Sequence, residues 1–284
     1  MSELQCSVFE GTSVANFIFL IAITGGIVVS YIPQYIRIWN RRSSEGLSTN
    51  FLLLGSSSSL FTLTNIILVS SKARHCCFIG ALSVFNCLNS LISLFQIGTQ
   101  SVCAVLILVF VLIWTGNSVL QDKHEYSRIV KVGYFVLIHA IVSIIQVFVG
   151  LMFGGKVLLR LAQLNGLMST LLTFIKYVPQ IHTTYKLKHP GTLSIGMMCI
   201  QTPGGAIFTA TLYFSKGSHW SSWISYFFAF LLQGTLLSLC IYYQYFKYHG
   251  ELADQLEREA IDRIVYENTT TSEASEPLLQ ESES

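Results

Sequence analysis

Long apolar blocks dominate this chain of 284 residues and constrain its fold more than any other feature. Each block has about the twenty residues that an α-helix needs to cross the hydrocarbon of a bilayer. Their polarity does not alternate as it would in the strands of a transmembrane barrel. The blocks cover roughly 14–36, 50–71, 76–97, 101–119, 130–153, 158–180, 193–215 and 221–246. This pattern predicts an all-α, polytopic membrane protein.

Charged residues make up 11% of the chain, against roughly a quarter of a soluble domain. Residues 1–249 carry 15 Lys/Arg and 5 Asp/Glu, whereas residues 250–284 carry 2 and 10. Basic loops that orient a helix bundle, followed by an acidic tail, explain this asymmetry without a nucleic-acid partner. No nucleophile–base set or metal-ligating cluster stands out among the blocks. The sequence therefore predicts no enzyme, no metal and no cofactor.

A segment around Pro33-Gln34 is repeated 146 residues later around Pro179-Gln180. Each copy ends an apolar block with Pro-Gln, crosses a basic loop and starts the next block at Leu-Ser. The identical pairs are Tyr31/Tyr177, Pro33/Pro179, Gln34/Gln180, Leu47/Leu193 and Ser48/Ser194. Two anchors at the same spacing in both copies indicate an internal duplication.

The duplication also constrains the topology. If both basic loops face the cytoplasm, an even number of spans separates them, although five blocks lie between. The block over 76–97 is the most polar, and its polar residues recur every three or four positions, as on one helical face. We expect it to be a re-entrant, packed or interfacial helix. Seven spans place eight Lys/Arg inside and five outside, with an exterior N-terminus and a cytoplasmic C-terminus.

The duplicated Pro-Gln motif, each copy closing a helix before a basic loop, resembles the PQ-loop family of membrane transporters. That family includes lysosomal and vacuolar amino-acid exporters, the lysosomal cystine transporter and, more distantly, SWEET sugar carriers and KDEL receptors. The second copy, from Phe174 to Gly205, is especially similar to the cystine-transporter branch and its fungal relatives. The resemblance implies two parallel three-helix repeats joined by a linker helix, with hinge or gating roles for Pro33, Gln34, Pro179 and Gln180.

From the resemblance and the blocks together, we expect five regions. These are an exterior or lumenal N-terminus (1–13), a first repeat (14–119), a linker helix (120–157), a second repeat (158–246) and an acidic cytoplasmic tail (247–284).

One position departs from the cystine-transporter pattern. Where that branch has an aspartate implicated in proton coupling, this chain has Gln201, in the stretch Gln-Thr-Pro-Gly-Gly. Lys176 and His139 remain as titratable candidates for a solute or proton path. Asn65 and Asn165 could face the same path or bond to neighbouring helices. We expect Gly25-Gly26 and Gly204-Gly205 to allow close helix packing.

Three cysteines near the exterior ends of spans suggest a crosslink. Cys6 precedes the first span, and Cys76-Cys77 follow the second, so in the seven-span topology all three face an oxidising side. We predict a disulfide from Cys6 to one of the adjacent pair; three free thiols are the alternative.

The function expected from these features is a carrier of a small-molecule solute, an amino acid by resemblance, working by alternating access in a vacuolar, lysosomal or other endomembrane. The alternatives are a cargo or peptide receptor of the KDEL-receptor type and a regulator of membrane lipids. Glu276-Pro-Leu-Leu279 resembles an acidic dileucine sorting signal, so Leu278 and Leu279 are candidates for contact with a sorting adaptor.

Overall fold

The computed structural model describes residues 6–11, 13–41, 49–116, 123–188 and 195–244. In these ranges the chain forms one 3₁₀ turn and nine α-helices, with no strand. They are η1 (Ser7–Phe9), α2 (Val14–Arg41), α3 (Thr49–Val69), α4 (Ser71–Phe78), α5 (Val84–Ser90), α6 (Ile92–Thr115), α7 (Lys123–Phe153), α8 (Gly155–Leu187), α9 (Ile195–Phe214) and α10 (Trp220–Tyr242). The α-helices other than α4 and α5 are long and apolar enough to cross a membrane, which makes seven candidate spans in the described chain. The predicted all-α, polytopic fold is confirmed.

The six candidate spans other than α7 form two halves with the same internal packing. α2, α3 and α6 make the first half, and α8, α9 and α10 make the second. In each half the third helix packs against the other two. Between the halves, α3 packs against α8 and α2 against α9, so the first helix of each half meets the second helix of the other. This exchange of partners is what a two-fold relation between the halves produces.

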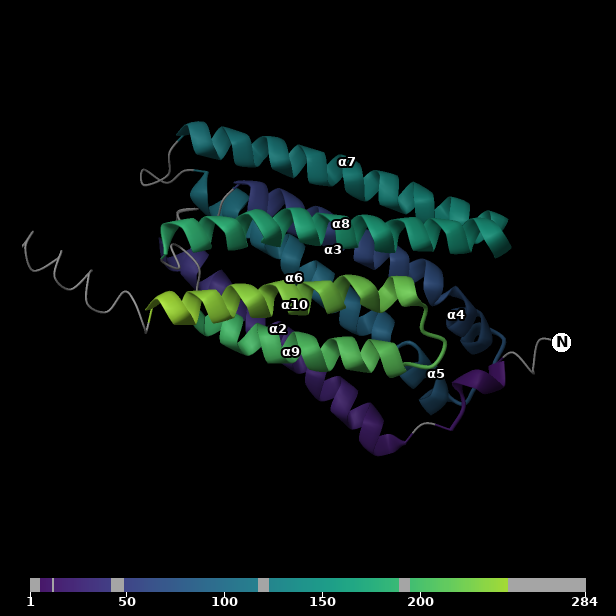
Figure 1. Ribbon diagram of the computed structural model, residues 1–284. Coiled ribbons are helices and arrows are strands. Elements are labelled where there is room, and N and C mark those ends of the chain that lie inside the picture. The colour runs from purple at the N-terminus through teal and green to yellow at the C-terminus, as the bar shows by residue number, and fades with distance from the viewer. Residues whose placement is uncertain (1–5, 12, 42–48, 117–122, 189–194, 245–284) are drawn as a thin grey trace, which may run out of the picture.

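The two helices that carry the sequence repeat correspond to each other. Pro33 lies inside α2 and Pro179 lies inside α8, 146 residues later, and both helices continue past the Pro-Gln pair instead of ending there as the sequence predicted. α2 and α8 run in the same direction, so both Pro-Gln motifs lie toward the same end of the bundle, which we call the Pro-Gln end (Figure 1). α7 lies outside the two halves and packs mainly on α3.

The region between α3 and α6 differs from the prediction. A single polar helix over 76–97 is wrong, because the chain forms α4, a turn over 79–83 and α5, and α6 already begins at Ile92. Gly80 has a φ of +70° in that turn, and Ser83 caps α5 by accepting the Asn86 N–H at 3.3 Å. The polar residues of the block are thus divided between two helices: Gln96 lies in α6, where it is buried and donates to the Leu20 carbonyl at 3.0 Å.

We call residues 71–90 the α4–α5 hairpin. It belongs to the first half alone: α10 begins 128 residues after α6, at Trp220 and Ile92, instead of the 146 that the repeat would give. The second half joins α9 to α10 through residues 215–219 only. The hairpin lies at the end of the bundle where α2 begins, opposite the Pro-Gln end (Figure 1).

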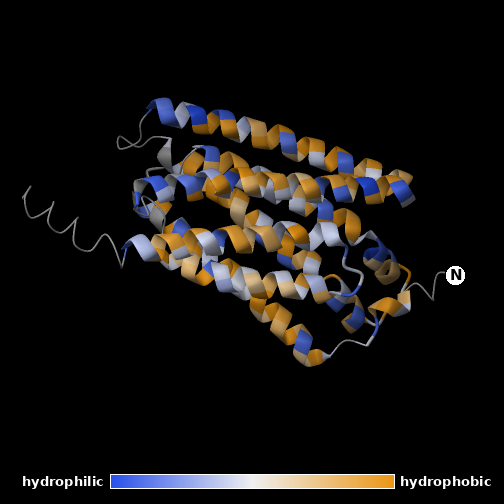
Figure 2. Ribbon diagram, in the orientation of Figure 1, coloured by the Kyte–Doolittle hydropathy of each residue, from blue (hydrophilic) through white to orange (hydrophobic). Residues whose placement is uncertain are grey.

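Lipid-facing and protein-facing surfaces differ most clearly on α7. Its apolar residues face outward, for example Ile144 at 69% and Phe148 at 64% exposure, and hydrophobic residues follow its length beyond a hydrophilic start (Figure 2). Since lipid is as apolar as these side chains, helix association depends on close approach and on polar bonds between helices. Gly166 provides such an approach, because a Cβ there would collide with the Ser221 carbonyl oxygen of α10.

The glycines singled out in the sequence do not play this part. A Cβ at Gly25, Gly26 or Gly204 would meet nothing within 4 Å, and one at Gly205 would reach Phe230 Cβ only at 3.8 Å. The expectation of close helix packing at these two pairs is therefore wrong. Gly26, Gly204 and Gly205 instead lie along a cavity, where the missing side chains leave open space.

Candidate functional site: a cavity between the two halves

A cavity of about 530 Å³ lies between the two halves. All six helices of the halves contribute residues to its wall, while α7 contributes none of those described. A small-molecule site typically has a volume of about 300–1,000 Å³ and a mainly apolar wall with a few polar groups. The cavity therefore has the size of a site for a small solute.

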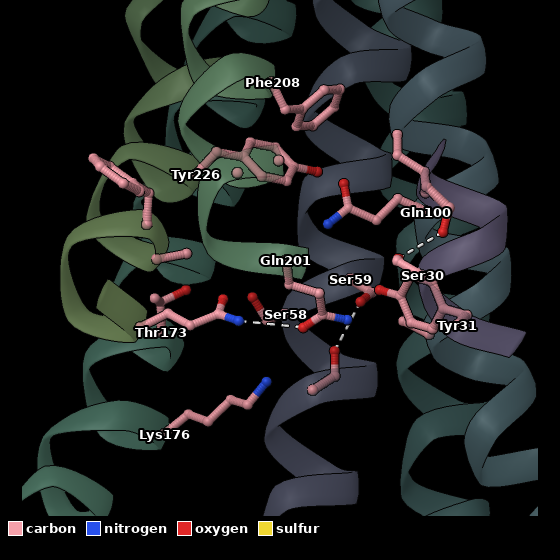
Figure 3. Close-up of a pocket in the computed structure, with 18 of the residues that line it drawn as sticks. Ser30, Tyr31, Ser58, Ser59, Gln100, Thr173, Lys176, Gln201, Phe208 and Tyr226 are labelled. Carbon is pink, nitrogen blue, oxygen red and sulfur yellow. Dashed lines mark hydrogen bonds between the residues drawn. The ribbon is translucent and has the colours of Figure 1, made fainter. Parts of the chain in front are cut away.

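The wall of this cavity is rich in hydroxyl and amide groups. Figure 3 shows several of them directed into the space between the helices, from α2, α3, α6, α8, α9 and α10. The polar lining residues are Ser30, Tyr31, Gln34, Ser56, Ser58, Ser59, Thr62, Gln100, Ser101, Ser169, Thr173, Lys176, Tyr177, Gln180, Gln201, Ser225, Tyr226 and Gln233. Hydroxyls and amides can donate and accept hydrogen bonds, so the wall suits a polar solute.

Lys176 is the one charged side chain among the described residues that line the cavity. It extends from α8 toward the cavity centre (Figure 3). Its ammonium lies 4.1 Å from the centre of the Phe51 ring and 5.0 Å from that of Tyr177. These ring faces stabilise the cation without neutralising it. A lysine near the end of a span can instead extend toward the headgroups, but the Lys176 ammonium lies over these two rings at the cavity wall.

Gln201 is held by its neighbours in the second half. The Tyr177 hydroxyl donates to Gln233 Oε1 at 3.3 Å, and Gln233 Nε2 donates to Gln201 Oε1 at 3.2 Å. This relay connects α8, α10 and α9 at the cavity wall. An amide at position 201 cannot exchange a proton as an aspartate would, so it can act here as a hydrogen-bonding group.

The halves meet at the middle of the cavity through two serines. Ser58 Oγ of α3 and Ser169 Oγ of α8 lie 2.9 Å apart, and the Ser169 hydroxyl also donates to the Ser58 carbonyl at 3.3 Å. A bond of this kind between α3 and α8 is specific, yet weak enough to break and re-form.

Toward the α4–α5 hairpin the cavity ends at an apolar cluster. Ile66 and Ile97 of the first half pack there with Phe208 and Leu212 of the second. Beyond the cluster lies a smaller cavity of about 190 Å³, whose wall includes Ile66, Leu212 and Phe9. The apolar cluster thus separates the central cavity from the hairpin end.

In each Pro-Gln motif the two residues face different surroundings. Gln34 and Gln180 line the cavity, while Pro33 and Pro179 are exposed on the surfaces of α2 and α8. Each proline removes one hydrogen bond from its helix, close to a glutamine that faces the cavity. The hinge role of the prolines stays a prediction.

Three of the predicted path residues lie outside the cavity wall. His139 of α7 packs on the Phe61 ring of α3, with ring centres 4.3 Å apart. Asn65 donates to the Ala162 carbonyl at 2.7 Å and to Ser221 Oγ at 2.9 Å. Asn165 donates to Gln146 Oε1 at 2.9 Å. The two asparagines connect helices, which was the alternative given for both, and His139 is not among the residues that line the cavity.

Sequence reasoning did not identify several lining residues. Tyr31, Gln100, Tyr226 and Gln233 all face the cavity. Gln233 carried a usable signal, since it interrupts an apolar run near the middle of α10. Tyr31 is repeated as Tyr177 in the duplicated segment, whereas Tyr226 carried no signal, because a tyrosine in an apolar block suits the headgroup region equally well.

The cysteines pair at the hairpin end. Cys6 is bonded to Cys76, one of the two partners predicted for it, with Cα atoms 5.7 Å apart. Cys77 is bonded to Cys87, with Cα atoms 5.4 Å apart, a pair that the sequence analysis did not propose. The dileucine residues Leu278 and Leu279, with the rest of the acidic tail, lie outside the described residues.

The fold and the cavity define a class: an integral, multi-pass membrane protein of two three-helix halves that enclose a shared polar cavity. The family model named PQ loop repeat matches residues 15–73 and 161–221, which contain the two Pro-Gln motifs. The chain therefore carries two PQ-loop repeats, as its resemblance implied.

Two further comparisons find similar proteins. An uncharacterised protein of Schizosaccharomyces pombe is 29% identical over 250 residues, covering 81% of this chain and 80% of that relative. The solved structure of a eukaryotic SWEET transporter superposes with a TM-score of 0.54 at 14% identity, covering 86% of this chain and 98% of the other. At that identity the second likeness shows the fold alone.

Proposed function

We propose that this protein carries a small polar solute across an endomembrane by alternating access, and that the solute is a neutral, zwitterionic amino acid. One observation carries the proposal: a polar cavity shared by both halves has Lys176 as the single charge on its described wall. The fold of a SWEET transporter and the duplicated PQ-loop repeat support a carrier.

The charge on the wall supports a solute with an anionic group. A solute carboxylate would pair with the Lys176 ammonium, and this attraction is stronger in a cavity shielded from water. A solute ammonium would find the amide oxygens of Gln201 and Gln233 and the ring faces of tyrosines. A cationic amino acid would add a second positive charge where no described lining residue is a carboxylate, so we expect it to bind more weakly.

The arrangement of contacts between the halves supports alternating access. The apolar cluster closes the cavity toward the hairpin, and it is built from both halves, so it can open only if they move apart at that end. The Ser58–Ser169 contact lies near the middle of the bundle, where such a movement would pivot. The paired prolines give matched weak points in α2 and α8.

A cavity shared by the two halves favours a carrier over a receptor for a cargo peptide or a regulator of lipids.

The decisive experiment measures flux by purified protein in proteoliposomes, with labelled neutral, acidic and cationic amino acids and sugars offered separately. We expect uptake of neutral amino acids above that of cationic ones. A complete lack of flux would contradict the carrier, and a preference for cationic amino acids would contradict the proposed solute.

Lys176→Met tests the residue, with Lys186→Met as its matched control. Lys186 lies on the same helix, is exposed and does not line the cavity. We expect Lys176→Met to lower uptake of a neutral amino acid by on the order of tenfold or more, since one charged hydrogen bond is lost. Lys186→Met should behave as the unaltered protein. Equal uptake by both variants would show that Lys176 does not take part in solute binding.

A further inference from the structure

The α4–α5 hairpin exposes large apolar side chains although it spans no membrane. Phe78 is 91% exposed, Val84 79%, Ile79 46% and Leu88 45%. Single exposed apolar residues are ordinary on a protein surface, but four within eleven positions form a patch that needs a partner.

Chain connectivity fixes this patch close to the membrane surface. α4 starts two residues after α3 ends at Val69, and α5 ends two residues before α6 begins at Ile92, so the hairpin connects the same ends of two spans. Phe85 of α5 also packs on Phe17 in the first turn of α2, with ring centres 5.4 Å apart. Figure 1 shows α4 and α5 at the end of the bundle where α2 begins.

The patch continues an apolar surface that already faces lipid. Near the Phe85–Phe17 contact, Val14 and Ile18 of α2 are 60% and 62% exposed on a candidate span. Lys72 of α4 is exposed and has the charge that suits lipid phosphates. Apolar residues with nearby cations are the pattern of segments that lie in the headgroup region.

Two disulfides hold the hairpin in this conformation. Cys77–Cys87 joins α4 to α5, and Cys6–Cys76 joins α4 to the N-terminal segment. Ala73, Cys76 and Leu82 fill the inner side of the hairpin, against Phe9. The exposed residues therefore cannot turn inward without breaking a packed and crosslinked core.

We propose that the hairpin is a membrane anchor, which inserts Phe78, Ile79 and Val84 into the headgroup and upper acyl region of the adjacent leaflet. The occupant of the patch is phospholipid, not a second protein. The second half has no counterpart, because residues 215–219 join α9 to α10 directly. The anchor therefore fixes the first half to the leaflet, and movements between the halves displace the second half relative to the lipid.

The test places a photo-crosslinking amino acid, p-benzoylphenylalanine, at Phe78 in the full chain, in nanodiscs of phosphatidylcholine and phosphatidylserine. We expect a phospholipid adduct by intact-protein mass spectrometry. The same probe at Ile144, which is exposed on the middle of α7, should also give an adduct. At Lys123, exposed at the hydrophilic start of α7, it should give much less.

A probe at Val84 provides a second position, so the result does not depend on one variant folding. Lipid adducts at both positions support the anchor. If both probes label lipid no more than the Lys123 probe does, the anchor is wrong. If they instead crosslink another polypeptide in native membranes, with no lipid adduct, the patch is a protein interface and the proposal is overturned.

Discussion

His219 stabilises the first turn of α10 as a neutral imidazole. Its Nδ1 accepts the Ser221 N–H at 3.3 Å, and Ser221 Oγ in turn accepts from Asn65 Nδ2 at 2.9 Å. Burial lowers the pKa of His219 below its usual value. Between the folded and unfolded pKa values the unfolded chain binds more protons, so the folded state loses stability as the pH falls through about 6.5.

A substitution that keeps the acceptor tests this contribution. We expect His219→Asn, which retains an N-cap oxygen, to lose less thermal stability than the unaltered protein between pH 7.5 and pH 5.5. His182→Asn is the control, because His182 is exposed on α8. The unfolding temperature in detergent, measured at both pH values, gives the result. If the unfolding temperature of His219→Asn changes between the two pH values as much as that of the unaltered protein and of His182→Asn, His219 does not cause the pH dependence.

At the scale of the elements, the contact between α8 and α10 depends on the missing side chain of Gly166. A Cβ there would collide with the Ser221 carbonyl oxygen, which belongs to backbone and cannot rotate away. We expect Gly166→Ala to lower stability by about 1–3 kcal/mol, as overpacking does. Gly25→Ala is the control, since nothing lies within 4 Å of its Cβ and alanine favours a helix. Thermal unfolding in detergent compares the stabilities of the two variants. Equal stabilities would contradict the close approach of α8 and α10 at Gly166.

The N-terminal segment is a second element whose position depends on few contacts. Cys6–Cys76 joins it to α4, and Phe9 lies against Gly217 of the α9–α10 connection, where a Cβ would come within 2.8 Å of the ring. The Lys216 ammonium donates to the Glu10 carbonyl. The segment therefore connects the first half to the second at the hairpin end.

Removal of that crosslink should be measurable. We expect Cys6→Ser to lower stability by about 2–4 kcal/mol, because the crosslink closes a long loop in the unfolded chain. Cys199→Ser, at a free and exposed cysteine of α9, should have little effect. Unfolding is followed with and without a reductant. The prediction fails if reductant leaves the unaltered protein as stable as before.

At the scale of the whole molecule, seven spans in alternating directions fix which loops share a side. Lys72 and Lys216 lie at the hairpin end, Lys123 and Lys186 at the Pro-Gln end, and all four are exposed. We expect a membrane-impermeant amine reagent to label the first two only from the lumenal side of sealed vesicles. The other two should react only from the cytoplasmic side.

Peptide mass spectrometry of labelled vesicles of both orientations provides the measurement. Labelling of Lys72 and Lys123 from one side would contradict the seven-span topology. Labelling with both pairs exchanged would keep the topology and reverse the orientation, so that the Pro-Gln end would face the lumen.

The sequence alone determined the number of spans and the duplication. These are properties of local composition and spacing: an apolar block of sufficient length must cross or be covered, and the two Pro-Gln motifs keep their 146-residue offset inside α2 and α8. The sequence did not determine the helix ends, because both helices continue past the Pro-Gln pair at which it placed them. The same information placed Gln34, Gln180, Lys176 and Gln201 near a path, because the repeat and the family resemblance marked them.

Only the tertiary structure decided which polar residues face the cavity and which connect helices. Asn65 and Gln34 are both amides in apolar blocks, yet one bonds across to α8 and α10 while the other faces the cavity. That difference depends on which helices lie next to each residue in space, and the sequence around a single residue does not predict this. For the same reason, the sequence did not predict the helix break at Gly80 or the Cys77–Cys87 disulfide. Each of them depends on how the hairpin folds back against the N-terminal segment.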